Sequence, residues 1–222
     1  LFLTFSATAA LLSSVATAVA QEGIQPNGRY SSVGATLFRT NYATDKCVLG
    51  ECHQGYGGLG INLSYQVIPN LIIGLRSMAG QSSGPNTTIR ESQGGLYLGF
   101  VMGVGEYWDI GGIVSPVTKR YENCLGTLCA TVEESGSNAE FFAKWWLDEA
   151  KTFNLGFNVN SYTYANGSTN PNAATKYTSS ALSVGYLMDG HHELSLSGTR
   201  LRDTASSTGV STTSNLAYTY RF

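Results

Sequence analysis

The sequence contains little charge and no long apolar run in its body. Asp, Glu, Lys and Arg make up 13% of the 222 residues, about half of the share in an ordinary soluble domain. The 13 basic and 15 acidic residues balance to a net charge of −2, which excludes the concentrated basic surface of a nucleic-acid-binding protein. Beyond the N-terminus no apolar run approaches the roughly 20 residues of a membrane helix. We therefore expect neither a nucleic-acid partner nor a helical membrane protein.

The chain is rich in glycine and tyrosine, and large apolar residues alternate with small polar ones. It holds 26 Gly and 13 Tyr. Residues 153–160 (FNLGFNVN) and 59–67 (LGINLSYQV) place apolar residues on one face and Asn, Gly or Ser on the other. A period of two over this length predicts β-strands. A soluble β-sandwich also alternates, but its solvent face would carry many Lys, Glu and Arg.

Alternation predicts ten strands with connections of two kinds. Short turns are expected at 68–70, 103–106, 148–151 and 189–192, and longer polar loops at 41–54, 81–88, 122–131, 165–175 and 203–211. Short turns at one end, longer loops at the other and an even strand count are the pattern of bacterial transmembrane barrels. We therefore predict a single all-β, antiparallel, up-and-down transmembrane β-barrel of about ten strands, with eight as the alternative and both termini on the short-turn side.

The first twenty residues are expected to be a signal peptide. They are apolar, and Ala18-Val19-Ala20 before Gln21 fits a signal-peptidase site. The segment lacks a basic start and opens on Leu1, so we expect it to be truncated at its beginning. The domain prediction is thus a signal peptide over 1–20 and the barrel over 21–222.

Aromatic residues suggest two interfacial bands. Trp108, Trp145 and Trp146 fall near the short turns, where amphipathic rings would meet the membrane surface. Six tyrosines near the longer loops could form the second girdle. They are Tyr42, Tyr56, Tyr121, Tyr162, Tyr164 and Tyr177.

The last nine residues, SNLAYTYRF, resemble the C-terminal assembly signal of bacterial outer-membrane barrels. Leu216, Tyr218, Tyr220 and Phe222 match the pattern of an apolar residue at every second position and a final aromatic. The chain as a whole is similar in pattern to small barrels of the OmpA/OmpX type, although those have eight strands. The resemblance implies an integral location in the bacterial outer membrane with periplasmic termini. It also implies contact with membrane lipid and lipopolysaccharide, and with the barrel-assembly machinery.

Four cysteines form two C-x4-C pairs, Cys47/Cys52 and Cys124/Cys129. In an exported protein disulfides persist, and we expect one within each polar loop; a cross-loop pairing stays possible. His53 could add a metal ligand, but structural zinc sites need four ligands. We therefore predict disulfides, with no metal and no cofactor.

The alternation of inward and outward positions along each strand, here called parity, places six ionisable residues in the lumen. They are Arg76, Glu91, Asp109, Glu140, Lys144 and Arg221. Buried charges of mixed sign favour an interlocked network, and a thin selective pore is the alternative.

No catalytic set is expected. His191 and His192 fall in a short turn beside Ser195, and His53 lies with Asp45 and Glu51 in one loop that we expect to be solvated. The sequence favours a non-enzymatic structural or surface-interaction protein that acts through disulfide-braced outer loops, in contact with a surface partner. The alternative is a narrow passive channel.

Overall fold

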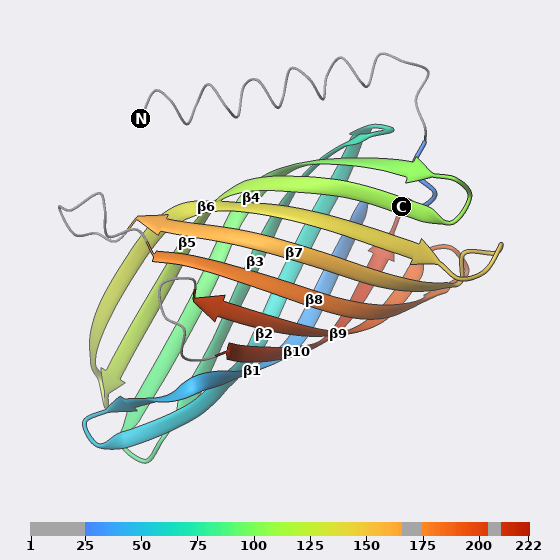
Figure 1. Ribbon diagram of the computed structural model, residues 1–222. Coiled ribbons are helices and arrows are strands. Elements are labelled where there is room, and N and C mark those ends of the chain that lie inside the picture. The colour runs from blue at the N-terminus through green and yellow to red at the C-terminus, as the bar shows by residue number, and fades with distance from the viewer. Residues whose placement is uncertain (1–24, 166–174, 204–209) are drawn as a thin grey trace, which may run out of the picture.

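The computed structural model describes residues 25–165, 175–203 and 210–222. Ten strands form one closed sheet (Figure 1). Their bounds are β1 Ser32–Val48, β2 Glu51–Ile68, β3 Leu71–Ser83, β4 Thr87–Val104, β5 Trp108–Leu125, β6 Leu128–Trp146, β7 Phe153–Ala165, β8 Thr175–Met188, β9 His192–Asp203 and β10 Val210–Arg221. Each strand is antiparallel to its sequence neighbours, and β1 also pairs with β10. The predicted ten-stranded up-and-down barrel is confirmed, and the count of eight is wrong.

Alternation decides which side chains face outward. Leu37, Ile61 and Leu182 are exposed to 56, 58 and 67% on the outer face, whereas the inward positions between them carry Gly, Asn, Ser and Thr. Leu216, Tyr218, Tyr220 and Phe222 also face outward at the end of the chain. Closure leaves no unpaired strand edge, as a sheet surrounded by lipid requires. Among the residues that the structure describes, no helix has the length and hydropathy to cross a bilayer.

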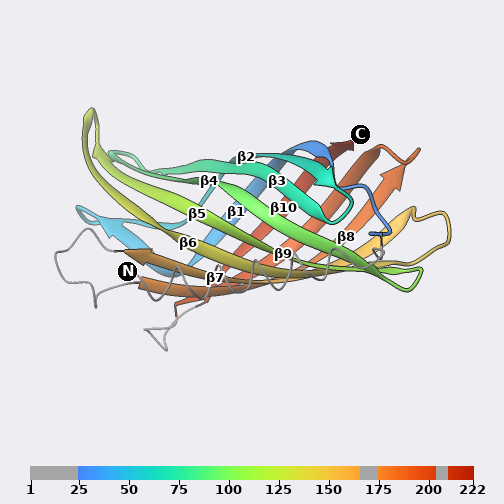
Figure 2. The ribbon, with the colours of Figure 1, turned by 90° about the horizontal axis from the view of Figure 1, so that it is seen from above.

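The two ends of the barrel differ. The connections of 69–70, 105–107, 147–152 and 189–191 are short, and residues 25–31 and the C-terminus lie at this turn end, where Phe222 N–H donates to Ser31 O at 3.0 Å. The opposite, hairpin end carries the β1–β2 and β5–β6 hairpins, which project in the same direction (Figure 2).

The predicted loops 41–54, 81–88 and 122–131 are mostly strand. β1 continues to Val48 and β2 starts at Glu51, so a two-residue turn remains, Leu49-Gly50, with φ of 48° and 86°. β5 and β6 likewise have 18 and 19 residues; at about 3.3 Å per residue and a tilt near 40°, such strands rise roughly 45 Å, past an apolar band of about 25 Å. The hairpins therefore project as a continued sheet. Most of the predicted loops 165–175 and 203–211 lies outside the described residues. The whole predicted signal peptide also lies outside them.

The tryptophans do not form one band. Trp108 and Trp145 face outward and stack with ring centroids 5.5 Å apart, as an interfacial girdle would. Trp146 is 1% exposed and points inward. Neighbouring strand residues point to opposite faces, so Trp145 and Trp146 could not both have been interfacial.

The interior of the turn-end half holds an apolar cluster. Ile72, Tyr97 and Val101 are buried together, with Tyr30, Ile113 and Phe142 packed against them. This half of the barrel has an apolar core beside its polar network.

Candidate functional site

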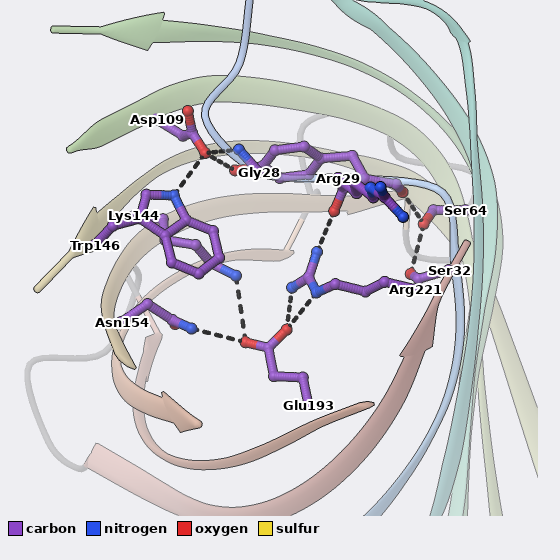
Figure 3. Close-up of polar contacts among 11 residues, drawn as sticks. Gly28, Arg29, Ser32, Ser64, Asp109, Lys144, Trp146, Asn154, Glu193 and Arg221 are labelled. Carbon is purple, nitrogen blue, oxygen red and sulfur yellow. Dashed lines mark hydrogen bonds and ion pairs between the residues drawn. The ribbon is translucent and has the colours of Figure 1, made fainter. Parts of the chain in front are cut away.

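Residues 25–31 close the turn end by binding the carboxylate of Asp109, which is 0% exposed. The backbone N–H groups of Asn27 and Gly28 donate to it at 2.5 and 2.9 Å. The Tyr30 hydroxyl and Trp146 Nε1 each donate to Oδ2 at 3.0 Å. Figure 3 shows the segment held against the side chains of Asp109 and Trp146. Four donors converge on one buried carboxylate, which satisfies its charge.

The approach of this segment requires glycine at position 28. A Cβ at Gly28 would lie 2.6 Å from Cζ2 of Trp146 and 3.3 Å from Oδ2 of Asp109. Beside it, Asn27 Nδ2 donates to the carbonyls of Gly105 and Trp108 at 3.1 and 2.7 Å. The N-terminal segment is therefore tied to the β4–β5 turn.

A second buried carboxylate, Glu193, holds two cations next to the first. Arg221 donates to Glu193 Oε2 from Nε at 2.6 Å and also from Nη2. Lys144 Nζ lies 3.3 Å from Oε1, and Asn154 Nδ2 donates to the same oxygen at 3.1 Å. Arg221 also donates to the backbone carbonyl of Arg29 (Figure 3). This network joins the segment of 25–31 to β6, β7, β9 and β10.

Three of the six charges predicted to be luminal thus gather at the turn end: Asp109, Lys144 and Arg221. Glu193, which links the last two, was missed. Its sequence signal was present, because Leu194 and Leu196 face outward on β9 and parity therefore turns Glu193 inward.

The middle of the lumen is crossed by an ion pair. Arg76 Nη1 lies 3.0 Å from Glu140 Oε2, and the Glu140 side chain is 6% exposed. Arg76 lines three internal cavities of about 210, 120 and 260 Å³. Cavities therefore lie on both sides of the pair: the cavity of about 260 Å³ on the turn-end side is also lined by Tyr30 and Arg221, and the cavity of about 210 Å³ lies toward the hairpins.

The hairpin-end half of the lumen is an aromatic chamber, and the predicted tyrosine girdle is wrong. Tyr56, Tyr162, Tyr164 and Tyr177 line the cavity of about 210 Å³. Parity explains the correction: Asn160, Tyr162 and Tyr164 alternate with outward Val159 on β7. All six tyrosines predicted for the girdle point inward: Tyr42, Tyr56, Tyr121, Tyr162, Tyr164 and Tyr177.

Glu91 and two lysines set the charge of this chamber. Glu91 accepts from the Tyr42 hydroxyl at 2.6 Å and from Lys46 Nζ at 2.7 Å. Lys119 Nζ lies 4.5 Å from the ring centroid of Tyr121 and 5.5 Å from that of Tyr177, within cation–π range. Lys46 was missed because its segment was predicted to be a loop.

Disulfides tie two hairpins near their tips. Cys47 is bonded to Cys52 and Cys124 to Cys129, and in each case the partners lie directly opposite one another across the two strands. The pairing is therefore local to each hairpin.

His53 does not lie in a solvated loop. It is 5% exposed, and its ring nitrogens lie 2.9 Å from Ser82 Oγ and 3.0 Å from Thr87 Oγ1. The Thr87 hydroxyl in turn donates to Glu51 at 2.6 Å. This bond lowers the pKa of the Glu51 carboxyl, and donation from Asn86 adds to the effect against a weaker opposing effect of desolvation. The chain of contacts joins the β1–β2 hairpin to β3 and β4.

No family model and no curated protein matches the sequence. Solved structures do match the fold. An outer membrane channel from Pseudomonas putida F1 is similar with a TM-score of 0.50 and 12% identity, over 90% of this chain and 98% of that chain. The translocator domain of the autotransporter NalP from Neisseria meningitidis has a TM-score of 0.50 and 12% identity, over 99% of this chain and 98% of that chain. The chain has the fold of bacterial outer-membrane β-barrels.

Proposed function

We propose that this protein is an outer-membrane barrel with a closed lumen that acts through its hairpin end, at the cell surface, as a structural or surface-interaction protein. The observation that carries the proposal is the closure of the turn end around Asp109 and Glu193. Both carboxylates are buried and engaged by donors from three strands (β6, β7 and β10) and the segment of 25–31. Breaking such a network leaves an unpaired buried charge, which costs about 3–5 kcal/mol, so the closed state dominates.

Solute efflux tests the closure. Vesicles that hold the refolded protein and a trapped monosaccharide should lose it no faster than protein-free vesicles. A matched set with a known porin shows that the assay detects an open barrel. Efflux above the protein-free rate would favour the passive channel instead.

The proposed orientation is tested separately by labelling in intact cells. A membrane-impermeant maleimide should react with Thr127→Cys in the β5–β6 hairpin and not with Glu149→Cys in the β6–β7 turn. Both positions are exposed, so a difference reports the side of the membrane. Labelling of Glu149→Cys alone would contradict the orientation.

A further inference from the structure

Two adjoining cavities in the lumen share part of their walls. Their volumes are about 210 and 120 Å³, and Arg76 and Tyr162 line both of them. We call this pair of spaces the Tyr162 cavities. Their lining residues take no part in the Asp109 and Glu193 networks, so the closure of the turn end leaves their side chains available for another role.

Amide oxygens in the walls of these cavities lack hydrogen-bond partners. Among the described residues, Oδ1 of Asn138, Asn158 and Asn215 is buried and accepts no hydrogen bond. Asn158 and Asn215 line the larger cavity. Asn138 lines the smaller one, is 4% exposed and lies opposite Tyr162 across β6 and β7. Because buried acceptors in proteins are nearly always paired, three of them around adjoining cavities indicate a ligand that supplies hydrogen-bond donors.

The ring of Tyr162 offers a flat apolar surface to the same ligand. It lies parallel to the ring of Tyr164, at 3° with centroids 6.2 Å apart, and Tyr164 is 2% exposed, so buried packing fixes its orientation. Lys119 Nζ lies over the rings of Tyr164 and Tyr177, whereas no cation of the described chain lies over that of Tyr162. The C–H groups of a sugar ring carry partial positive charge and pack against the negative face of such an aromatic ring.

The charges around the Tyr162 cavities balance. The charged residues that line the cavities, or pair with those that do, are Arg76, Lys46 and Lys119 against Glu140, Glu91 and Glu134. Arg76 forms an ion pair with Glu140, and Lys46 forms one with Glu91. Glu134 lies opposite Lys119 across β5 and β6. A charged ligand would bring an uncompensated charge into this interior, which is costly, so the cavities suit an uncharged one.

We propose that the Tyr162 cavities bind an uncharged sugar ring that enters from the hairpin end. The C–H face of the ring packs on Tyr162. Its hydroxyl groups donate to the three unpartnered amide oxygens and accept from Arg76, whose side chain is 40% exposed. The larger volume of about 210 Å³ falls below the roughly 300–1,000 Å³ of sites for drug-sized ligands, which limits the ligand to a single ring. The direction of entry rests on the proposed closure of the turn end.

Saturation-transfer NMR on the refolded protein in nanodiscs tests this binding. The probes are the methyl glycosides of glucose, galactose, mannose and N-acetylglucosamine, with methyl glucuronide as the charged control. At least one neutral glycoside should bind with a Kd below about 10 mM. The glucuronide should bind at least about tenfold more weakly than that glycoside, because its carboxylate finds no unpaired cation.

A free monosaccharide and the terminal unit of a surface glycan share this chemistry. A trisaccharide that ends in the bound sugar separates the two sources. Affinity equal to that of the methyl glycoside would identify a glycan end as the ligand, and loss of affinity would identify a free sugar.

Three variants localise the binding. Tyr162→Ala removes the aromatic surface and Asn215→Leu removes one acceptor from another strand, and each should weaken binding by about fivefold. Tyr186→Ala removes the same side chain from the outward face, where Tyr186 is 41% exposed, and should change the Kd by less than about twofold. Heat-modifiable gel mobility shows that each variant is folded.

The site would be overturned if no neutral glycoside bound with a Kd below about 10 mM, or if Tyr186→Ala weakened binding as much as Tyr162→Ala. Equal binding of the glucuronide would overturn the selection of an uncharged ring. Binding in nanodiscs does not depend on conduction. A sugar that binds and also escapes from vesicles would therefore refute the closed lumen and leave the site, whereas a sugar that does neither would refute the site and leave the closure.

Discussion

Substituting Asp109 by Asn should release residues 25–31 from the turn end. The carboxylate accepts four hydrogen bonds, three of them on Oδ2. An amide of the same shape can keep its oxygen toward those three donors, but its NH2 group then faces the backbone N–H of Asn27. The bond from Asn27 N–H is lost, because two donors then face one another. The other three bonds remain but are no longer made to a charged group.

The magnitude follows from these losses. A buried donor left unsatisfied costs about 1–3 kcal/mol, and a hydrogen bond to a charged group contributes about 1 kcal/mol more than a neutral one. The sum is about 4–6 kcal/mol for local opening, equal to a rise of about a thousandfold or more in the open population. Tyr30→Phe removes a single bond and should raise opening about tenfold.

Amide hydrogen exchange in nanodiscs measures this opening. Peptides that contain Asn27 and Gly28 should exchange about a thousandfold faster or more in Asp109→Asn, while strand peptides from β7 keep their protection. Unchanged protection of Asn27 and Gly28 would refute the assignment of Asp109 as the anchor. Loss of protection in every strand would show that Asp109 supports the whole barrel.

Three further outcomes are expected. Cys47→Ser, which frees Cys52, should destabilise the β1–β2 hairpin by about 2 kcal/mol but leave the heat-modifiable gel mobility of the barrel unchanged. Loss of the folded barrel would contradict the local role of the disulfide. Phe222→Ser should reduce the yield of inserted barrel in cells, and a normal yield would count against the C-terminal assembly signal. The lowered pKa of Glu51 means that its bonds stabilise the hairpin contact above the unfolded pKa near 4.3 and are lost as the pH falls through the lower folded value. The protection factor of the Thr87 amide, which corrects for the intrinsic exchange rate at each pH, should therefore fall in acid in the wild type and lack this acid step in Glu51→Gln.

The barrel could be predicted from the sequence because lipid enforces a strict alternation. Leu155, Phe157 and Val159 face outward and Asn154, Asn158 and Asn160 face inward, so each strand shows its two faces directly. The hairpin extensions could not be recognised in this way. Around Cys47 and Cys124 the strands run past the apolar band, so the outward positions are polar as well, and the sequence looks like a loop.

The site was only partly predictable. Parity predicted that Asp109, Lys144 and Arg221 face the lumen. It gave neither their positions along the barrel axis nor the residues that they contact. The contribution of residues 25–31 could not be inferred, because Asn27, Gly28 and Tyr30 precede the first strand and follow no period. The inward direction of Tyr162 and Tyr164 was available from parity, whereas the interfacial preference of tyrosine suggested a girdle.

Single-channel conductance of the refolded protein in a planar bilayer tests the central claim most directly, with folding established by heat-modifiable gel mobility. A lumen closed by the Asp109 and Glu193 networks and crossed by the Arg76–Glu140 pair predicts a silent bilayer. Reproducible conductance steps that change when Arg76 or Lys144 is substituted would contradict the closed lumen and make these charges the filter of a channel.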